Sequence, residues 1–223
     1  MSIFAKYMAD TGSYQLTNVG YIVLVATMLL VFLLGFFLFR QRSTKKADTK
    51  QLVFSSMAIA IAMVTSLIRL FRMPMGGSVT LFSMFFICLV GYMYGLGAGI
   101  TAGISYGFLQ LIVDPYIISV PQMFIDYILA YGSLGFSGVF CKRKHGLYKG
   151  YILGFCCRYF FAFLSGLIFF GSYAADYNMS APVYSLLYNG AYLGAEAVLT
   201  LVVLALPPVI SAISYIKQAA LAQ

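Results

Sequence analysis

The chain has 223 residues, of which 62% are hydrophobic and 9% are charged. Soluble domains carry about a quarter charged residues, so this composition excludes an ordinary soluble protein and indicates an integral membrane protein. The net charge of +8 does not point to a nucleic-acid partner, because the basic residues gather in two blocks between apolar runs, at 40–50 and 142–149. Basic blocks of this kind are typical of cytoplasmic loops.

Seven apolar stretches have about the length that a helix needs to cross a bilayer core, roughly 20 residues. Runs of this length predict helices rather than the short alternating strands of a barrel. The predicted fold class is therefore an all-α integral membrane protein. The expected spans are residues 19–39, 52–71, 79–94, 96–113, 121–140, 149–171 and 184–206.

The placement of the basic residues predicts the orientation of these spans. If the N-terminus lies outside, one face collects ten Lys and Arg residues and the other collects three, so the C-terminus is expected in the cytoplasm. Residues 1–50 would then form an outer N-terminus, one extra transmembrane helix and a basic cytoplasmic linker. Residues 51–223 would form a six-helix membrane domain, with outer loops at 73–78, 114–120 and 173–183.

Two stripes of small residues follow helical spacing. Glycines recur every four residues from Gly95 to Gly107, so that another helix backbone can approach closely. This stripe serves either tight packing inside the bundle, which we favour, or a docking face. Ala58 and Ala62 form a second stripe, for which spacing alone leaves internal and external packing open.

Asp126 and Glu196 are the acids that lie within apolar spans. An ionised carboxylate at membrane depth costs about 3 kcal/mol or more, so it faces a protein interior, pairs with a base or performs a function. Arg158 is the basic residue well inside a span, which makes a structural ion pair one interpretation of either acid. Asp126 differs because it lies six residues from the expected outer loop and precedes Tyr127. That depth suits the floor of a pocket that opens to the outside.

Aromatic and amide side chains are frequent in the outer halves of the later spans. One explanation is an interfacial belt, for which tyrosine is well suited. The other is a cage of aromatic faces around a ring-shaped or cationic ligand, with an acid as counter-charge. An aspartate in the same layer favours the cage. These side chains are Tyr116, Phe169, Phe170, Tyr173, Tyr177, Tyr184, Tyr188 and Asn189.

The sequence offers no catalytic or metal-binding constellation. The one histidine, His145, lies in a basic loop, and the four cysteines show no CxxC spacing. A GxxxxGK[ST] motif is absent, so the chain does not hydrolyse a nucleotide by that route. We therefore expect no enzyme activity, no metal and no cofactor, and any energy for uphill transport must come from elsewhere.

Five strings, RMPMGGSVTL, YGFLQLI, PQMFIDYILAYGSLGFSG, RYFFAFLSGLIFFGSYA and YSLLYNGAYLGAE, occur in this order across residues 51–206. Together they resemble the thiamine-specific S-components of energy-coupling factor (ECF) vitamin transporters, the ThiT family. The resemblance implies a multi-pass protein of the bacterial plasma membrane that binds its vitamin from outside. It also implies docking on a transmembrane coupling subunit whose two ATPase subunits supply the energy.

The resemblance also implies roles for particular residues. Ala58 and Ala62 resemble the AxxxA motif that meets the coupling subunit. Thiamine carries a cationic thiazolium and a flat aminopyrimidine, which suit a carboxylate, aromatic faces and an amide. The implied substrate-binding residues are Tyr116, Asp126, Tyr127, Phe170, Tyr184 and Asn189.

The chain departs from the family at two positions. Ala162 stands where the family commonly has histidine, and Phe170 where it has tryptophan, which this chain lacks entirely. The expected ligand is thiamine, with another small heteroaromatic compound, such as a thiamine precursor or another water-soluble vitamin, as the alternative. A stand-alone carrier that exchanges protons at Asp126 or Glu196, and a structural membrane protein without a ligand, are the remaining alternatives.

Overall fold

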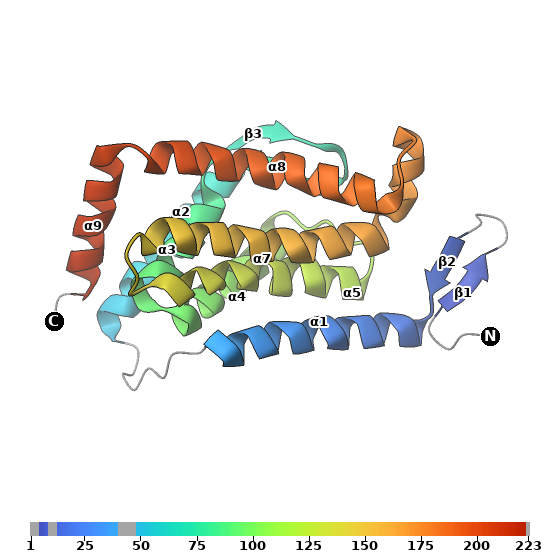
Figure 1. The fold of residues 1–223 in the computed structure, drawn as a ribbon, viewed down its shortest axis with the longest axis horizontal. Coiled ribbons are helices and arrows are strands. Elements are labelled where there is room, and N and C mark those ends of the chain that lie inside the picture. The colour runs from blue at the N-terminus through green and yellow to red at the C-terminus, as the bar shows by residue number, and fades with distance from the viewer. Residues whose placement is uncertain (1–4, 9–12, 40–47, 222–223) are drawn as a thin grey trace.

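The computed structural model describes residues 5–8, 13–39 and 48–221. Most of the predicted basic linker, at 40–47, lies outside the described residues. The long helices run roughly side by side, with α8 along one side of the bundle and α1 along the other (Figure 1).

Helices make up most of the described chain; one pair of short strands precedes them and a second pair lies between α2 and α3. The strands are β1 (Ala5–Met8), β2 (Ser13–Leu16), β3 (Arg69–Arg72) and β4 (Ser78–Thr80), with β1 antiparallel to β2 and β3 antiparallel to β4. The helices are α1 (Asn18–Phe39), α2 (Thr49–Leu67), η1 (Pro74–Gly76), α3 (Ser83–Tyr94), α4 (Leu96–Val113), α5 (Val120–Met123), η2 (Phe124–Leu129), α6 (Ala130–Gly132), η3 (Ser133–Phe140), α7 (Gly146–Phe169), η4 (Gly171–Tyr177), α8 (Ala181–Leu204) and α9 (Pro207–Leu221).

Five helical segments in the described part of the chain are long and apolar enough to cross a membrane. They are α2, α4, the continuous run Val120–Phe140, α7 and α8. Two shorter apolar helices, Asn18–Leu34 and Ser83–Tyr94, accompany them. The expected helical membrane protein is therefore confirmed, with five long helices where seven full spans were predicted.

The second and third predicted spans were too long at the ends that face each other. Continuous helices were expected to residue 71 and from residue 79, whereas α2 ends at Leu67 and α3 begins at Ser83. The intervening residues form the β3–β4 hairpin, which η1 closes, and Met73 N–H donates to the Gly77 carbonyl over 2.8 Å. Proline and glycine in MPMGGS favour this turn over a helix. We call Arg69–Thr80 the hairpin segment.

The fifth span is helical but not uniformly α-helical. It passes from α5 through the π-helix η2 and the short α6 into the 3-10 helix η3. The glycine stripe of α4 packs directly on this irregular run: a Cβ at Gly107 would lie 1.8 Å from the Tyr127 carbonyl oxygen, and a Cβ at Gly103 would lie 2.4 Å from that of Tyr131. The glycines therefore serve internal packing, as we favoured.

The extra helix α1 packs on the same irregular run. Phe32 is buried and makes an edge contact with Phe136, with ring centroids 5.7 Å apart, and Tyr21 stacks on Phe169 at 5.5 Å. A Cβ at Gly132 would lie 3.3 Å from the Phe32 ring. The first predicted span thus packs against the other helices of the bundle.

Helix α9 follows the last predicted span and was not expected. It turns away from α8 at one end of the bundle (Figure 1). Lys217 Nζ donates to the carbonyl oxygens of Cys141 (2.8 Å) and Tyr92 (3.2 Å), and burial lowers the pKa of this amine. These contacts fasten α9 to the end of the bundle that carries the basic loop at 141–145.

Candidate substrate-binding site

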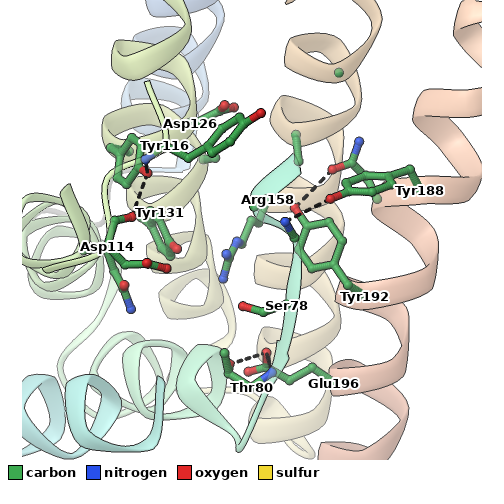
Figure 2. Close-up of a pocket in the computed structure, with 18 of the residues that line it drawn as sticks. Ser78, Thr80, Asp114, Tyr116, Asp126, Tyr131, Arg158, Tyr188, Tyr192 and Glu196 are labelled. Atoms are coloured by element: carbon green, nitrogen blue, oxygen red, sulfur yellow. Dashed lines mark hydrogen bonds between the residues drawn. The ribbon is translucent and has the colours of Figure 1, made fainter. Parts of the chain in front are cut away.

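A polar and aromatic cavity lies between α4, the Val120–Phe140 run, α7, α8 and the hairpin segment (Figure 2). All six predicted substrate-binding residues contribute to its wall. The fold therefore brings the predicted residues, which come from four separate segments of the chain, together in one cavity. These six are Tyr116, Asp126, Tyr127, Phe170, Tyr184 and Asn189.

Asp126 lies on the π-helical turn that follows α5. Ser119 caps α5, with Gln122 N–H donating to its Oγ over 3.3 Å, and Pro121 occupies the first turn, where its missing N–H costs nothing. The wider π-turn is a frequent feature of functional sites. Gln122 Nε2 donates to Asp126 Oδ2 over 2.6 Å, and within the described residues no base lies within 4.0 Å of this carboxylate. Asp126 thus retains acceptor capacity for a ligand.

Tyr127 holds the loop that carries Tyr116. Its Oη accepts from the Tyr116 N–H over 2.7 Å and donates to the Asp114 carbonyl over 3.2 Å. Gln122 Nε2 also donates to the Tyr116 carbonyl, over 3.1 Å. Because the hydroxyl of Tyr127 already has a donor and an acceptor, its ring rather than its Oη is available to the cavity.

Two aromatic stacks contribute to the cavity wall. Tyr116 stacks on Phe170 with centroids 6.0 Å apart, and Tyr184 stacks on Tyr188 at 5.6 Å. These four rings line the cavity, which supports the aromatic cage over a simple belt. The other aromatic residues of the predicted layer, Phe169, Tyr173 and Tyr177, are not part of its wall.

Asn189 is buried in the wall that α8 contributes. Its Nδ2 donates to the Ser185 carbonyl over 2.9 Å, and its Oδ1 accepts from Tyr192 Oη over 3.1 Å. Gly166 of α7 fits against this pair, since a Cβ there would lie 2.3 Å from Ser185 Oγ. The amide is therefore oriented by its neighbours on α7 and α8 before any ligand enters.

Glu196 is held at the opposite end of the cavity from Asp126 in the view of Figure 2. Its carboxylate accepts from Thr80 Oγ1 (2.6 Å), Thr80 N–H (3.4 Å), Ser83 Oγ (3.2 Å) and Met84 N–H (3.0 Å). The last of these donors belongs to the first turn of α3, where a negative charge is favourable. The ion pair considered for Glu196 is thus replaced by a saturated set of hydrogen bonds within the described residues.

The hairpin segment closes over the cavity through further contacts. Arg69 forms an ion pair with Asp114 at 2.7 Å. Tyr188 Oη donates to the Pro74 carbonyl and accepts from Gly77 N–H over 2.9 Å. These contacts, together with those of Glu196, join the segment to the end of α4 and to α8.

The cavity wall also contains residues that were not predicted from the sequence as site residues. Arg158 was considered only as an ion-pair partner, yet its guanidinium lies in the cavity, 4.2 Å from the centroid of Tyr131. Gln110 and Tyr106, one helical turn apart on α4, also line it and share a 2.5 Å hydrogen bond. The signal that could have found Arg158 was its position as the basic residue well inside an apolar span.

The formal charge of the cavity wall is negative by one unit. Its charged residues are the acids Asp114, Asp126 and Glu196 and the bases Arg69 and Arg158, so three acids face two bases. Among the described residues no group of three or more His, Cys, Asp or Glu could hold a metal ion. The arrangement suits an organic monocation with flat rings.

Ala58 and Ala62 lie on the face of α2 that packs inside the protein. They are 6% and 0% exposed, and Ala58 packs in a cluster with Val90 and Ala102. Of the two alternatives for Ala58 and Ala62, internal and external packing, the structure therefore has internal packing. The outward face of the same helix carries another small pair with the same spacing, Ser56 and Ala60, both exposed.

Comparison with known proteins decides the family of this chain. The family described as thiamine transporter protein (Thia_YuaJ) matches residues 52–215. The chain belongs to this family. The thiamine transporter ThiT of Bacillus subtilis is 32% identical over 148 residues, which cover 60% of this chain and 76% of that protein. ThiT of Lacticaseibacillus paracasei is 30% identical over 134 residues, covering 52% and 66%, respectively.

A solved structure agrees with this assignment. ThiT from Listeria monocytogenes superposes with a TM-score of 0.61 at 27% identity, covering 71% of this chain and 94% of that chain. The predicted S-component family of thiamine transporters is thereby confirmed. Membership in the Thia_YuaJ family makes the chain a multi-pass transport protein and not an enzyme. The family match begins at residue 52, after α1 and the linker.

Proposed function

We propose that this protein captures thiamine from outside the cell in the cavity described above. The observation that carries the proposal is the convergence of the six predicted residues on one cavity with a formal charge of minus one. Thiamine is a monocation with two flat rings, so Asp126 would supply counter-charge while the rings of Tyr116, Phe170 and Tyr184 would contact its faces.

The proposed orientation places the cavity loops and the N-terminus outside and the basic loops in the cytoplasm. The basic loop at 141–145 and Lys217 lie at one end of the bundle, away from the loops that close the cavity. Anionic lipid and the positive-inside rule favour that end in the cytoplasm. We further propose that α1 is an additional transmembrane helix before a six-helix unit, residues 51–223, as the sequence predicts.

Delivery of the vitamin would require docking on a coupling subunit with two ATPase subunits. The family resemblance assigns this contact to Ala58 and Ala62, which α3 and α4 cover in this structure. We propose that the exposed small pair on the same helix, Ser56 and Ala60, meets the partner directly. Ala60→Leu is then expected to abolish uptake in cells while vitamin binding by the isolated protein is kept. If the Ala60→Leu variant still supports uptake, the coupling subunit does not bind at Ser56 and Ala60.

Calorimetric titration of the purified protein with thiamine tests the proposed function. We expect one thiamine per chain and tight binding, with biotin and riboflavin as vitamins that should give no heat. A protein that ignores thiamine and binds a different ring compound would contradict the vitamin assignment and leave the family intact.

A thiamine-related compound is the second candidate, and one feature of the cavity favours it. Ala162 offers only a methyl group to the wall, at a position where a larger ring is common in the family. The space beside it would accept an additional substituent. A thermal-shift panel of thiamine precursors and degradation products compares the two candidates, because the true ligand produces the largest rise in melting temperature at equal concentration.

A further inference from the structure

Arg158 is a cation inside the cavity, and none of the described carboxylates forms an ion pair with it. Figure 2 shows its side chain pointing from α7 into the space between Tyr131 and Tyr192. The centre of the guanidinium lies 4.2 Å from the Tyr131 centroid, and no described carboxylate lies within 4.0 Å. A ring face stabilises the charge, and beyond the Tyr131 hydroxyl, which lies within reach of the guanidinium, most of its five N–H donors stay available.

Neither of the two carboxylates of the cavity interior, Asp126 and Glu196, forms an ion pair with Arg158. Glu196 accepts four hydrogen bonds from the hairpin segment and the start of α3. Asp126 accepts from Gln122 on its own helix. The donors of Arg158 are therefore directed at whatever occupies the cavity, and buried donors without a partner are costly.

The space around Arg158 is suited to a ligand rather than to another side chain. Ala162 follows four residues later on α7, so it lies on the same face of the helix and also lines the cavity. Because its side chain ends at a methyl group, it leaves room beside the guanidinium. Tyr131 and Tyr192 flank the position with flat rings (Figure 2).

We propose that Arg158 is the subsite that binds the hydrogen-bond-accepting end of the ligand. This inference rests on the proposed function, in which the ligand is thiamine. The ring nitrogens of the aminopyrimidine accept hydrogen bonds from the guanidinium, whereas the thiazolium, which a guanidinium repels, lies toward Asp126. The cavity thus has one acidic and one basic pole, and these poles fix the direction in which the vitamin is bound.

The test compares Arg158→Met and Asp126→Asn in the full chain by calorimetry with three ligands. They are thiamine, an analogue whose thiazolium is replaced by a neutral ring, and an analogue whose pyrimidine nitrogens are replaced by CH groups. Arg158→Met is expected to raise Kd at least about tenfold for thiamine and for the neutral-ring analogue, but not for the CH analogue. Asp126→Asn is expected to weaken thiamine and the CH analogue, with little effect on the neutral-ring compound.

The sign of the effect of Arg158→Met decides between binding and simple repulsion. A guanidinium that only repels the cationic ring predicts tighter thiamine binding by Arg158→Met, and that result would overturn the proposal. A penalty that persists with the CH analogue would overturn it as well. Arg143→Met, in the exposed basic loop, is the matched control and should leave Kd unchanged.

Two further measurements keep the outcome unambiguous. If Arg158→Met yields no folded protein, Arg158→Lys retains the charge and loses the planar fork, and an unchanged Kd for thiamine would overturn the proposal. If the wild-type protein itself does not bind thiamine, the proposed function fails, and this assignment of Arg158 fails with it. Thiamine binding by wild type with no loss in either variant refutes the Arg158 subsite alone.

Discussion

The two ends of the cavity contain the same chemical group in different environments. Around Glu196, four donors from Thr80, Ser83 and Met84 surround the carboxylate, and it joins α8 to the hairpin segment and to the first turn of α3. Around Asp126, Gln122 donates from the same helix, and the Ser165 hydroxyl of α7 is the other donor nearby. The first acid completes the fold, and the second is left with acceptors for a ligand.

This difference shows how an acid in an apolar span should be interpreted. Depth in the membrane alone marks both residues as functional or paired. What separates them is the number of donors that the protein itself supplies. A saturated carboxylate is a structural element, whereas an unsaturated one beside aromatic rings is a binding group.

Removing the saturated carboxylate should give the largest effect. Glu196→Ala leaves two backbone N–H groups and one of the two hydroxyls, which can still bond to each other, without an acceptor, so we expect a loss of about 3 kcal/mol in stability. The melting temperature of the ligand-free protein in detergent should fall by several degrees. Asp176→Asn, an exposed acid in η4, is the control and should not change it. An unchanged melting temperature for Glu196→Ala would remove the distinction between the two acids.

The wall that carries Asp126 depends on the close approach of α4. Gly107→Ala places a Cβ 1.8 Å from the Tyr127 carbonyl oxygen, so the helices must separate at a cost of about 2 kcal/mol. Gly97→Ala is the matched control, because nothing lies within 4 Å of its Cβ. We expect thermal unfolding to show a lower melting temperature for Gly107→Ala, and an equal or higher one for Gly97→Ala, since alanine favours a helix. Equal melting temperatures for the two variants would contradict the packing described.

The unsaturated carboxylate should affect binding more than folding. Asp126→Asn is expected to weaken thiamine at least tenfold, which corresponds to about 1.4 kcal/mol. The melting temperature without ligand should change by far less than in Glu196→Ala. Calorimetry and thermal unfolding of the same preparations measure both quantities. A variant that unfolds early and binds normally would reverse the roles assigned to the two ends.

The smallest effect is expected at the Tyr188 hydroxyl, which contacts the hairpin segment. Tyr188→Phe keeps the ring that lines the cavity but removes the hydroxyl that links Pro74 and Gly77 to α8. We expect a loss of about 1 kcal/mol in thiamine affinity, because a neutral hydrogen bond contributes on that scale. Stopped-flow measurement should show faster release of thiamine, with little change in its association rate. Release at the wild-type rate would show that the hydroxyl does not hold the segment closed.

Much of the fold was predictable because apolar length and glycine spacing are local signals. The runs that became α4, α7 and α8 matched their predicted ranges within a few residues, and the glycine stripe of α4 packs as favoured. The hairpin segment was missed because Leu70, Phe71 and Val79 continue the apolar runs on either side of MPMGGS. Their pairing across MPMGGS is a contact between segments that hydropathy does not register.

The residues of the site could be predicted where the family pattern supplied them. The number of hydrogen-bond partners that each side chain has in the fold could not. All six expected residues line the cavity, but the number of partners at Asp126 and Glu196 depends on Gln122 in one case and on Thr80 and Ser83 in the other. Arg158 has no carboxylate within 4.0 Å among the described residues, which its position in the sequence does not reveal. Ala58 and Ala62 were placed on a helix face that the sequence could not orient, and they pack inward.

A structure of the protein with thiamine bound tests the central claim most directly. We expect the thiazolium beside the Asp126 carboxylate, the aminopyrimidine at Arg158, and Glu196 still hydrogen-bonded to Thr80, Ser83 and Met84. A thiazolium that contacts Glu196, or a vitamin bound outside this cavity, would contradict it.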